Sequence, residues 1–170
     1  MNMRARSANN FLCGDLDEIV ARCHERGAKA YLTLNTILFD AELDEAKTLC
    51  RMAKEAGVDA LIGADLAVLQ IARAEGLSVH LSVQANVTNL AAVQFFAAFA
   101  DVIVLARELS LDQIRGIIEG IRKNTIIGPS GNPVQIEIFA HGALCVAFSG
   151  KCQMSLSLYG PKASATPMRA

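Results

Sequence analysis

The chain has 170 residues, of which 52% are hydrophobic and 19% charged, and its net charge is −1. This length and composition are typical of one globular domain, and the balanced charge gives no support for a protein that binds nucleic acid through bulk charge. No apolar run approaches the roughly 20 residues of a membrane-spanning helix. No apolar segment of a secretory signal follows the basic N-terminus, so we expect a cytoplasmic protein with no membrane partner.

The hydrophobic pattern predicts five strands that alternate with helices. Strands that alternate with helices of ten or more residues indicate right-handed βαβ units and a parallel sheet. We expect an α/β fold that forms part of a (β/α)8 TIM-like barrel; a flavodoxin-like open sheet is the alternative. Helices are predicted at residues 15–27, 40–57, 66–76, 88–100 and 110–124, with N-caps Asp15, Asp65, Thr88 and Ser110, and strands at residues 28–37, 58–65, 77–86, 101–107 and 134–140.

Polar side chains recur at every second position of three predicted strands. Successive strand residues point to opposite faces, so the apolar set can pack on the helices while the polar set faces inward. In an open sheet with helices on both faces, the polar side chains would lie under helices, where their hydrogen bonds would be hard to satisfy. The pattern therefore favours a barrel whose lumen holds a ligand or a set of hydrogen-bonded side chains. The polar set is Tyr31, Thr33, Asn35, His80, Ser82, Gln84, Gln135 and Glu137.

The candidate site lies at or near the predicted carboxyl ends of the strands, because barrel active sites are built there. A strand-end arginine such as Arg107 suits a carboxylate or phosphate group. The alternative for each residue is a side chain that only caps a loop. Glu108 is also at a strand end, and its alternative is a residue that only begins the following helix. We expect Asn35, Gln84, Asn86 and Arg107 to bind substrate and Arg107, Glu137 and His141 to have catalytic roles.

Five cysteines in a chain without an export signal do not predict a disulfide framework. Cys23 and Cys50 fall within helical patterns and are expected to be small buried hydrophobic residues, and Cys13 is ambiguous. Cys145 and Cys152 lie in the glycine-broken run EIFAHGALCVAFSGKCQMS, residues 137–155. A glycine-rich loop after a strand lets backbone and thiols approach a ligand, so this pair is the candidate set of metal ligands.

Other interpretations of the pair stay open. Cys145 could pack as an apolar thiol in ALCVAF, or form a thiol dyad with His141. The two thiols, alone or with His141, could also hold zinc, although the seven-residue step is not a usual zinc spacing. A His-Glu-x-x-His helix and a Gly-x-Ser-x-Gly elbow are both absent from the sequence.

Four stretches of the chain, MRARSANNF, YLTLNTILFDAEL, VLARELSLDQI and EIFAHGALCVAFSGKCQMS, resemble peptidase family U32, the collagenase-like proteases. The resemblance implies a barrel-like N-terminal domain. It also implies one of two activities: peptide-bond hydrolysis, or oxygen-independent hydroxylation of ubiquinone precursors or RNA pyrimidines. In the hydroxylating members four cysteines hold an iron–sulfur cluster, and Cys145 and Cys152 match the first two of the four by position.

The resemblance also predicts that the chain is incomplete. Family members begin with a further strand and helix and continue into a stretch with two more cysteines. We therefore expect a partial barrel over residues 1–160 and an irregular tail over residues 161–170 that reflects truncation or a frameshift. Two thiols cannot saturate a four-cysteine cluster, so no stable cluster is expected in this chain, and exposed strand edges would favour homo-oligomers.

For the complete protein, the resemblance favours iron–sulfur-dependent hydroxylation of an RNA pyrimidine, with RNA as partner. The alternatives are a peptidase, a hydrolase acting on a peptide substrate, or an inactive fragment that serves in binding or assembly.

Overall fold

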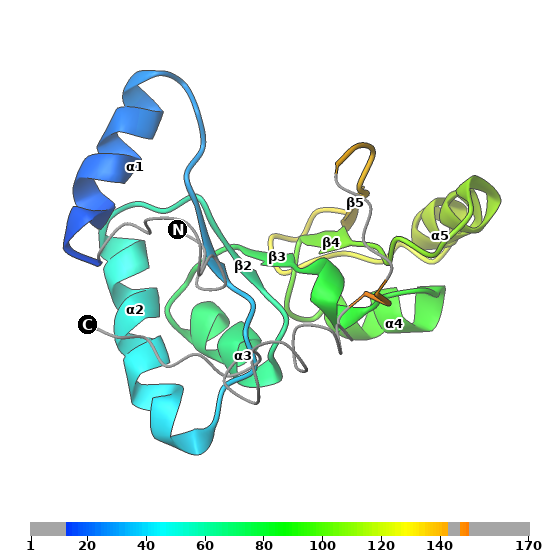
Figure 1. The fold of residues 1–170 in the computed structure, drawn as a ribbon. Helices are drawn as coiled ribbons and strands as arrows, with labels where there is room; N and C mark the ends of the chain where they lie inside the picture. The colour runs from blue at the N-terminus through cyan, green and yellow to red at the C-terminus, as the bar shows by residue number, and fades with distance from the viewer. Residues whose placement is uncertain (1–12, 143–146, 150–170) are drawn as a thin grey trace.

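The structure is a computed structural model that describes residues 13–142 and 147–149 (Figure 1). Cys145, Cys152 and the predicted tail lie outside these ranges. Within them, the helices are α1 (Leu16–Glu25), α2 (Leu43–Glu55), α3 (Leu66–Ala74), α4 (Leu90–Phe96) and α5 (Leu111–Lys123), and the strands are β1 (Tyr31–Leu34), β2 (Ala60–Gly63), β3 (Val79–Leu81), β4 (Val102–Val104) and β5 (Gln135–Glu137). Short 3-10 helices occur at η1 (Cys13–Asp15), η2 (Asp40–Glu42) and η3 (Val83–Ala85).

The strands form one parallel sheet in the order β1-β2-β3-β4-β5. Each strand therefore pairs with the strand that precedes it in the chain. A flavodoxin-like sheet would reverse direction at a switch point, so that alternative is wrong. Right-handed crossovers that always advance in one direction put their helices on one face of the sheet; Figure 1 shows α3 and α4 on the same side of the strands. The fold is an incomplete TIM-like barrel.

The face of the sheet toward the helices forms the core. Leu32, Leu61, Val79, Leu81 and Ile103 point to this face and are fully buried. They belong to one cluster with buried residues of α2, α3, α4 and α5. Full burial of one such side chain stabilises the fold by about 1.5–3 kcal/mol, so this shared core holds the sheet and its helices together.

The side chains at the alternate strand positions face away from the core, as predicted. Thr33 and His80 are half-buried on this inner face, and Tyr31, Gln135 and Glu137 are exposed. The inner face is not wholly polar, because the half-buried residues Ile62 and Val102 flank His80 in the register of the sheet.

Two local predictions were wrong. The strand predicted over residues 77–86 ends at Leu81, and η3 follows it. The N-cap of α4 is Asn89 rather than Thr88, because Asn89 Oδ1 accepts the Ala92 N–H at 2.9 Å. Asp65 and Ser110 cap α3 and α5 as predicted. Asp15 precedes α1 but makes no side-chain cap hydrogen bond there.

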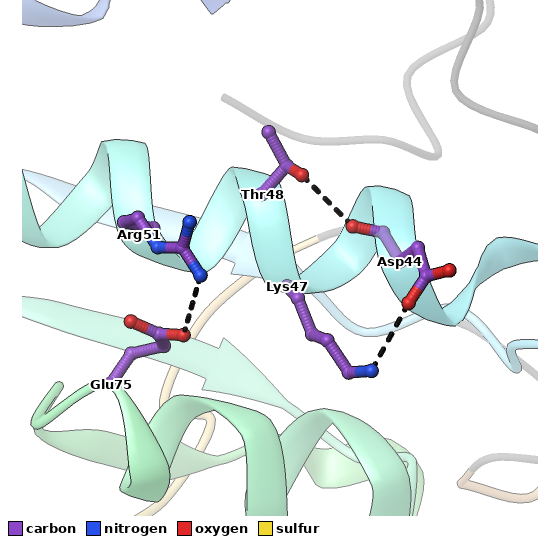
Figure 2. A network of polar contacts seen from close by, with 5 residues as sticks. All are labelled: Asp44, Lys47, Thr48, Arg51 and Glu75. Carbon is purple, nitrogen blue, oxygen red and sulfur yellow. Dashed lines mark hydrogen bonds and ion pairs between the residues drawn. The ribbon is translucent and has the colours of Figure 1, made fainter.

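The outer surface of α2 carries a polar network that also reaches α3 (Figure 2). Lys47 Nζ lies 3.1 Å from Asp44 Oδ1, and Thr48 Oγ1 donates to the Asp44 carbonyl at 3.0 Å. Arg51 Nη2 lies 3.6 Å from Oε1 of Glu75, the C-cap residue that follows α3. Exposed pairs of this kind contribute about 0–1 kcal/mol each, so they adjust the outer surface and do not define the fold.

None of the helices in the described part of the chain has the length and apolar character needed to cross a membrane.

Candidate functional site

Asn35 and Ser82 meet at the carboxyl edge of the sheet, although β2 lies between their strands. Gly63 pairs with Leu81, so continuing the register by one residue places Ala64 between Asn35 and Ser82. The small side chain of Ala64 leaves room for Asn35 Nδ2 to donate to Ser82 Oγ at 3.4 Å. This contact crosses the top of β2 and joins the ends of β1 and β3.

The chain leaves the sheet after Ser82, whose N–H still donates to the Gly63 carbonyl at 2.7 Å. Ser82 Oγ accepts the Gln84 N–H at 3.3 Å and so starts η3. Asn86 ends the turn with φ of 52°, a left-handed conformation that asparagine tolerates well. Pairing resumes at Val87, which bridges to Leu105. Gln84 therefore stands on a turn at the rim of the sheet, not on the inner face of a strand as predicted.

Two buried oxygens beyond β1 have no hydrogen-bond partner among the described residues, Asn35 Oδ1 and Thr36 Oγ1. Buried polar atoms are nearly always paired, and an unpaired one costs about 1–3 kcal/mol. By the alternation along β1, Asn35 lies on the inner face with Tyr31 and Thr33. Thr36, only 2% exposed, lies on the face toward the core. An N–H or O–H donor at the rim would satisfy Asn35 Oδ1, which is consistent with the substrate-binding role predicted for Asn35.

A second polar group joins the end of β4 to the segment Ala147–Ser149. Ser149 donates its N–H to Glu108 Oε1 at 2.8 Å and its hydroxyl to Glu108 Oε2 at 3.1 Å. Arg107 donates its backbone N–H to Ser149 Oγ at 3.3 Å and its Nη2 to the Ala147 carbonyl at 2.8 Å. Ser149 is only 1% exposed, so this group anchors the returning chain against the rim.

The carboxylate of Glu108 is the electrostatic centre of this group. Desolvation is the largest single influence and would raise the pKa of Glu108. The hydrogen bonds from backbone N–H groups and from the Ser149 hydroxyl, with the charge of Arg107, outweigh it and lower the pKa below 4.5. Glu108 is therefore ionised near neutral pH and holds Ser149 as a charged acceptor.

His80 lies on the inner face of β3 next to Tyr31, with 4.9 Å between the ring centroids. Burial is the largest influence and lowers the pKa of His80 below 6.5, and the charge of Lys29 acts in the same direction. The carboxylates of Glu137 and Asp101 raise the pKa, but by less. His80 is therefore a neutral imidazole near pH 7, able to donate one hydrogen bond and accept another.

The predicted site residues form separate groups in the described structure. Asn35 and Gln84 share Ser82, whereas Arg107 belongs with Glu108 and Ser149; no hydrogen bond among the described residues joins the two groups. Glu137 is exposed on β5, and His141 is exposed four residues later. The catalytic and binding roles of Asn35, Gln84, Asn86, Arg107, Glu137 and His141 stay predictions.

Cys50 lies in the hydrophobic core, and Cys23 packs against it. Cys50 is fully buried in α2, where burial, assisted by the charge of Glu75, raises the pKa of its thiol to about 11. Across residues 13–142 and 147–149, no three His, Cys, Asp or Glu side chains gather in a way that could hold a metal ion. The candidate ligands Cys145 and Cys152 lie outside those residues.

Sequence reasoning missed the roles of Ser149, Ser82 and Glu108. The sequence offers helix initiation as one interpretation of Glu108, whereas in the structure its carboxylate accepts hydrogen bonds from a residue 41 positions away. The available signal was the polar pair Arg107-Glu108 directly after an apolar strand, matched by one serine between the two cysteines.

The chain was also compared with known proteins. The sequence profile described as peptidase family U32 matches residues 1–166. The chain is 48% identical over 164 residues to a collagenase of Porphyromonas gingivalis, covering 96% of the chain and 40% of the relative. It is 39% identical to a 23S rRNA 5-hydroxycytidine synthase of Escherichia coli, covering 93% of the chain and 22% of the relative.

A third relative is tRNA hydroxylation protein P of Escherichia coli, 36% identical, with 91% of the chain and 32% of the relative covered. No solved structure matches the chain. The chain thus spans less than half the length of each of these relatives. Because the family profile covers nearly all of its residues, the chain belongs to peptidase family U32.

Proposed function

We propose that the protein containing this chain hydroxylates a pyrimidine base of RNA, and that the chain supplies part of the barrel and two ligands of an iron–sulfur cluster. Relatives named as rRNA and tRNA hydroxylation proteins support the reaction class and RNA as the partner. An RNA substrate of this kind would be met in the cytoplasm.

The observation that carries the proposal is the anchoring of Ala147–Ser149 at the carboxyl end of β4. Cys145 and Cys152 flank this segment in the sequence, two residues before it and three after it. Barrel enzymes build their active sites at this end of the strands. The anchor therefore supports a role for the two cysteines at the rim of the barrel.

The side chains available for this chemistry have distinct roles in the proposal. Asn35, Gln84 and Asn86 bind the base or ribose by hydrogen bonds, and Arg107 attracts a phosphate or carboxylate group. Glu137 and His141 move protons. Thiolates are the usual ligands of iron–sulfur clusters, so Cys145 and Cys152 fit such a group, which supplies electron transfer when bound. Two further cysteines from the rest of the longer protein would complete the set.

Peptide hydrolysis is the second candidate. It is supported by the 48% identity to a protein named collagenase.

Nucleoside analysis separates the two candidates. Deleting the gene should remove, from tRNA or rRNA, a pyrimidine nucleoside heavier by one oxygen atom, as measured by mass spectrometry of digested RNA. The intact gene should restore this nucleoside, Cys145→Ala and Cys152→Ala should not, and Cys23→Ala on α1 is the matched control. An unchanged nucleoside profile, together with peptide cleavage by iron-free protein, would favour the peptidase.

The cluster requirement can be tested on the chain itself. Anaerobic treatment with iron and sulfide should leave the 170-residue chain without a stable cluster, because its two candidate thiolates are fewer than the four that such clusters usually need. Iron and acid-labile sulfide are measured after gel filtration. Stoichiometric uptake of both by monomeric chain would contradict this expectation.

A further inference from the structure

Beyond β4, successive backbone N–H groups point alternately toward β5 and toward the chain that follows β3. Leu105 donates its N–H to the Glu137 carbonyl of β5 at 3.0 Å, and Ala106 donates in the other direction, toward the chain that follows β3, at 2.9 Å. By this alternation the Arg107 N–H points again to the β5 side. Its acceptor there is Ser149 Oγ at 3.3 Å. The Ser149 hydroxyl thus takes the position of the next carbonyl acceptor, beyond the end of β5.

Both the hydroxyl and the N–H of Ser149 hold it in this position. Its hydroxyl accepts from Arg107 and donates to Glu108 Oε2, and its N–H donates to Glu108 Oε1. One carboxylate therefore receives both donors of one buried residue. Hydrogen bonds to charged acceptors are stronger than neutral ones, and two from the same residue fix its orientation as well as its position.

We propose that Glu108 and Ser149 are positioning residues, whose paired hydrogen bonds fix the segment Ala147–Ser149 to the end of β4 and thereby restrain the loop that carries Cys145 and Cys152. Arg107 contributes through its backbone N–H and through its guanidinium, which holds the Ala147 carbonyl. The importance of this restraint for a reaction rests on the proposed function; the restraint itself does not.

Amide hydrogen exchange measured by NMR tests the anchor directly. Exchange at residue 149 should become about tenfold faster in Ser149→Ala, which loses one hydrogen bond to a charged group. It should become faster still in Glu108→Ala, which loses two such bonds. Glu108→Gln keeps an acceptor for the N–H but not for the hydroxyl, so its effect should be intermediate. Glu119→Gln and Ser78→Ala alter exposed residues away from the anchor and are the matched controls.

Thiol labelling tests the consequence for the loop. Trypsin cuts at Lys151, between the two cysteines, so iodoacetamide labelling of each can be quantified on a separate peptide. Glu108→Ala and Ser149→Ala should change the labelling rates of Cys145 and Cys152 in the same direction. The rate at Cys23 and the exchange of core amides such as Leu81 should stay at their wild-type values, which a general loss of stability would not allow.

Exchange at residue 149 that is unchanged in Glu108→Gln and Ser149→Ala would overturn the anchor. Faster exchange with unchanged labelling of both cysteines would overturn the restraint on the loop. If exchange and labelling change as expected but no hydroxylated nucleoside depends on the gene, the proposed function fails while this inference stands.

Discussion

The protonation of His80 is coupled to folding, because its pKa is lowered by burial in the folded chain. The unfolded chain should bind a proton near pH 6.5, whereas the folded chain binds it only at lower pH. The stabilisation from neutral His80 is therefore fully present above about pH 7 and is lost as the pH falls through the lowered pKa.

The corresponding prediction concerns the pH dependence of stability. Between about pH 7 and pH 5 the free energy of unfolding should fall less steeply in His80→Gln than in the wild type. Urea unfolding at a series of pH values measures this difference. His141→Gln, which removes an exposed imidazole beyond β5, is the control. Equal slopes for His80→Gln and the wild type would show that His80 does not titrate differently on folding.

Single residues differ in how far the sequence predicts them. Cys50 was expected to be a buried hydrophobic residue, and it is, because its environment follows from the apolar period of one helix. The contact between Arg107 and Ser149 spans 42 positions and depends on the path of a loop. Local patterns carry no information about such a path, so the sequence suggested an external anion for Arg107 but did not suggest its hydrogen bonds to Ala147 and Ser149.

At the scale of elements, α5 packs on α4 through a close contact at Gly120. A Cβ atom added there would lie 2.6 Å from Leu90 Cδ2, whereas a Cβ at Gly116, one turn earlier, would meet nothing within 4 Å. The two glycines have the same helical backbone but different neighbours, which makes them a matched pair.

Gly116→Ala should raise the free energy of unfolding by about 0.5–1 kcal/mol, because alanine is the better helix former. Gly120→Ala has the same intrinsic gain but must displace Leu90, so it should stabilise less or destabilise. Thermal and urea unfolding of both variants give the comparison. Equal stabilisation by the two substitutions would contradict the packing of α4 on α5.

The sequence predicted the type and order of the helices and strands better than it predicted where each of them ends. The alternation of strand and helix follows from hydrophobic periodicity, and Asp65 and Ser110 cap their helices as their positions suggest. The end of β3 was missed because Ser82 fits the alternation of polar and apolar residues that a longer strand would show. In the structure its hydroxyl instead accepts a backbone N–H and turns the chain into η3.

At the scale of the whole molecule, β1 and β5 each pair on one side only within the described sheet. Unpaired edges are templates for association with other strands. We expect the isolated chain to self-associate as its concentration rises, and sedimentation measurements over a range of concentrations would detect this. A constant monomer mass over that range would contradict it.

A pair of variants tests whether the β5 edge takes part. Ile138, 44% exposed, follows β5, and Ile127, 51% exposed, lies outside the named strands. A lysine near an open edge opposes strand pairing, so Ile138→Lys should weaken association more than Ile127→Lys. Equal weakening by both would indicate association through general hydrophobic contact instead.

The order of the strands has a further consequence for biosynthesis. Each new strand needs only the strand made immediately before it as a template, since neighbours in the sheet are also neighbours in the chain. Pairing only between consecutive strands keeps each closed loop as short as this parallel topology allows, which limits the entropic cost of loop closure. We therefore expect the sheet to grow from its β1 end while the chain is still leaving the ribosome, one strand–helix unit at a time.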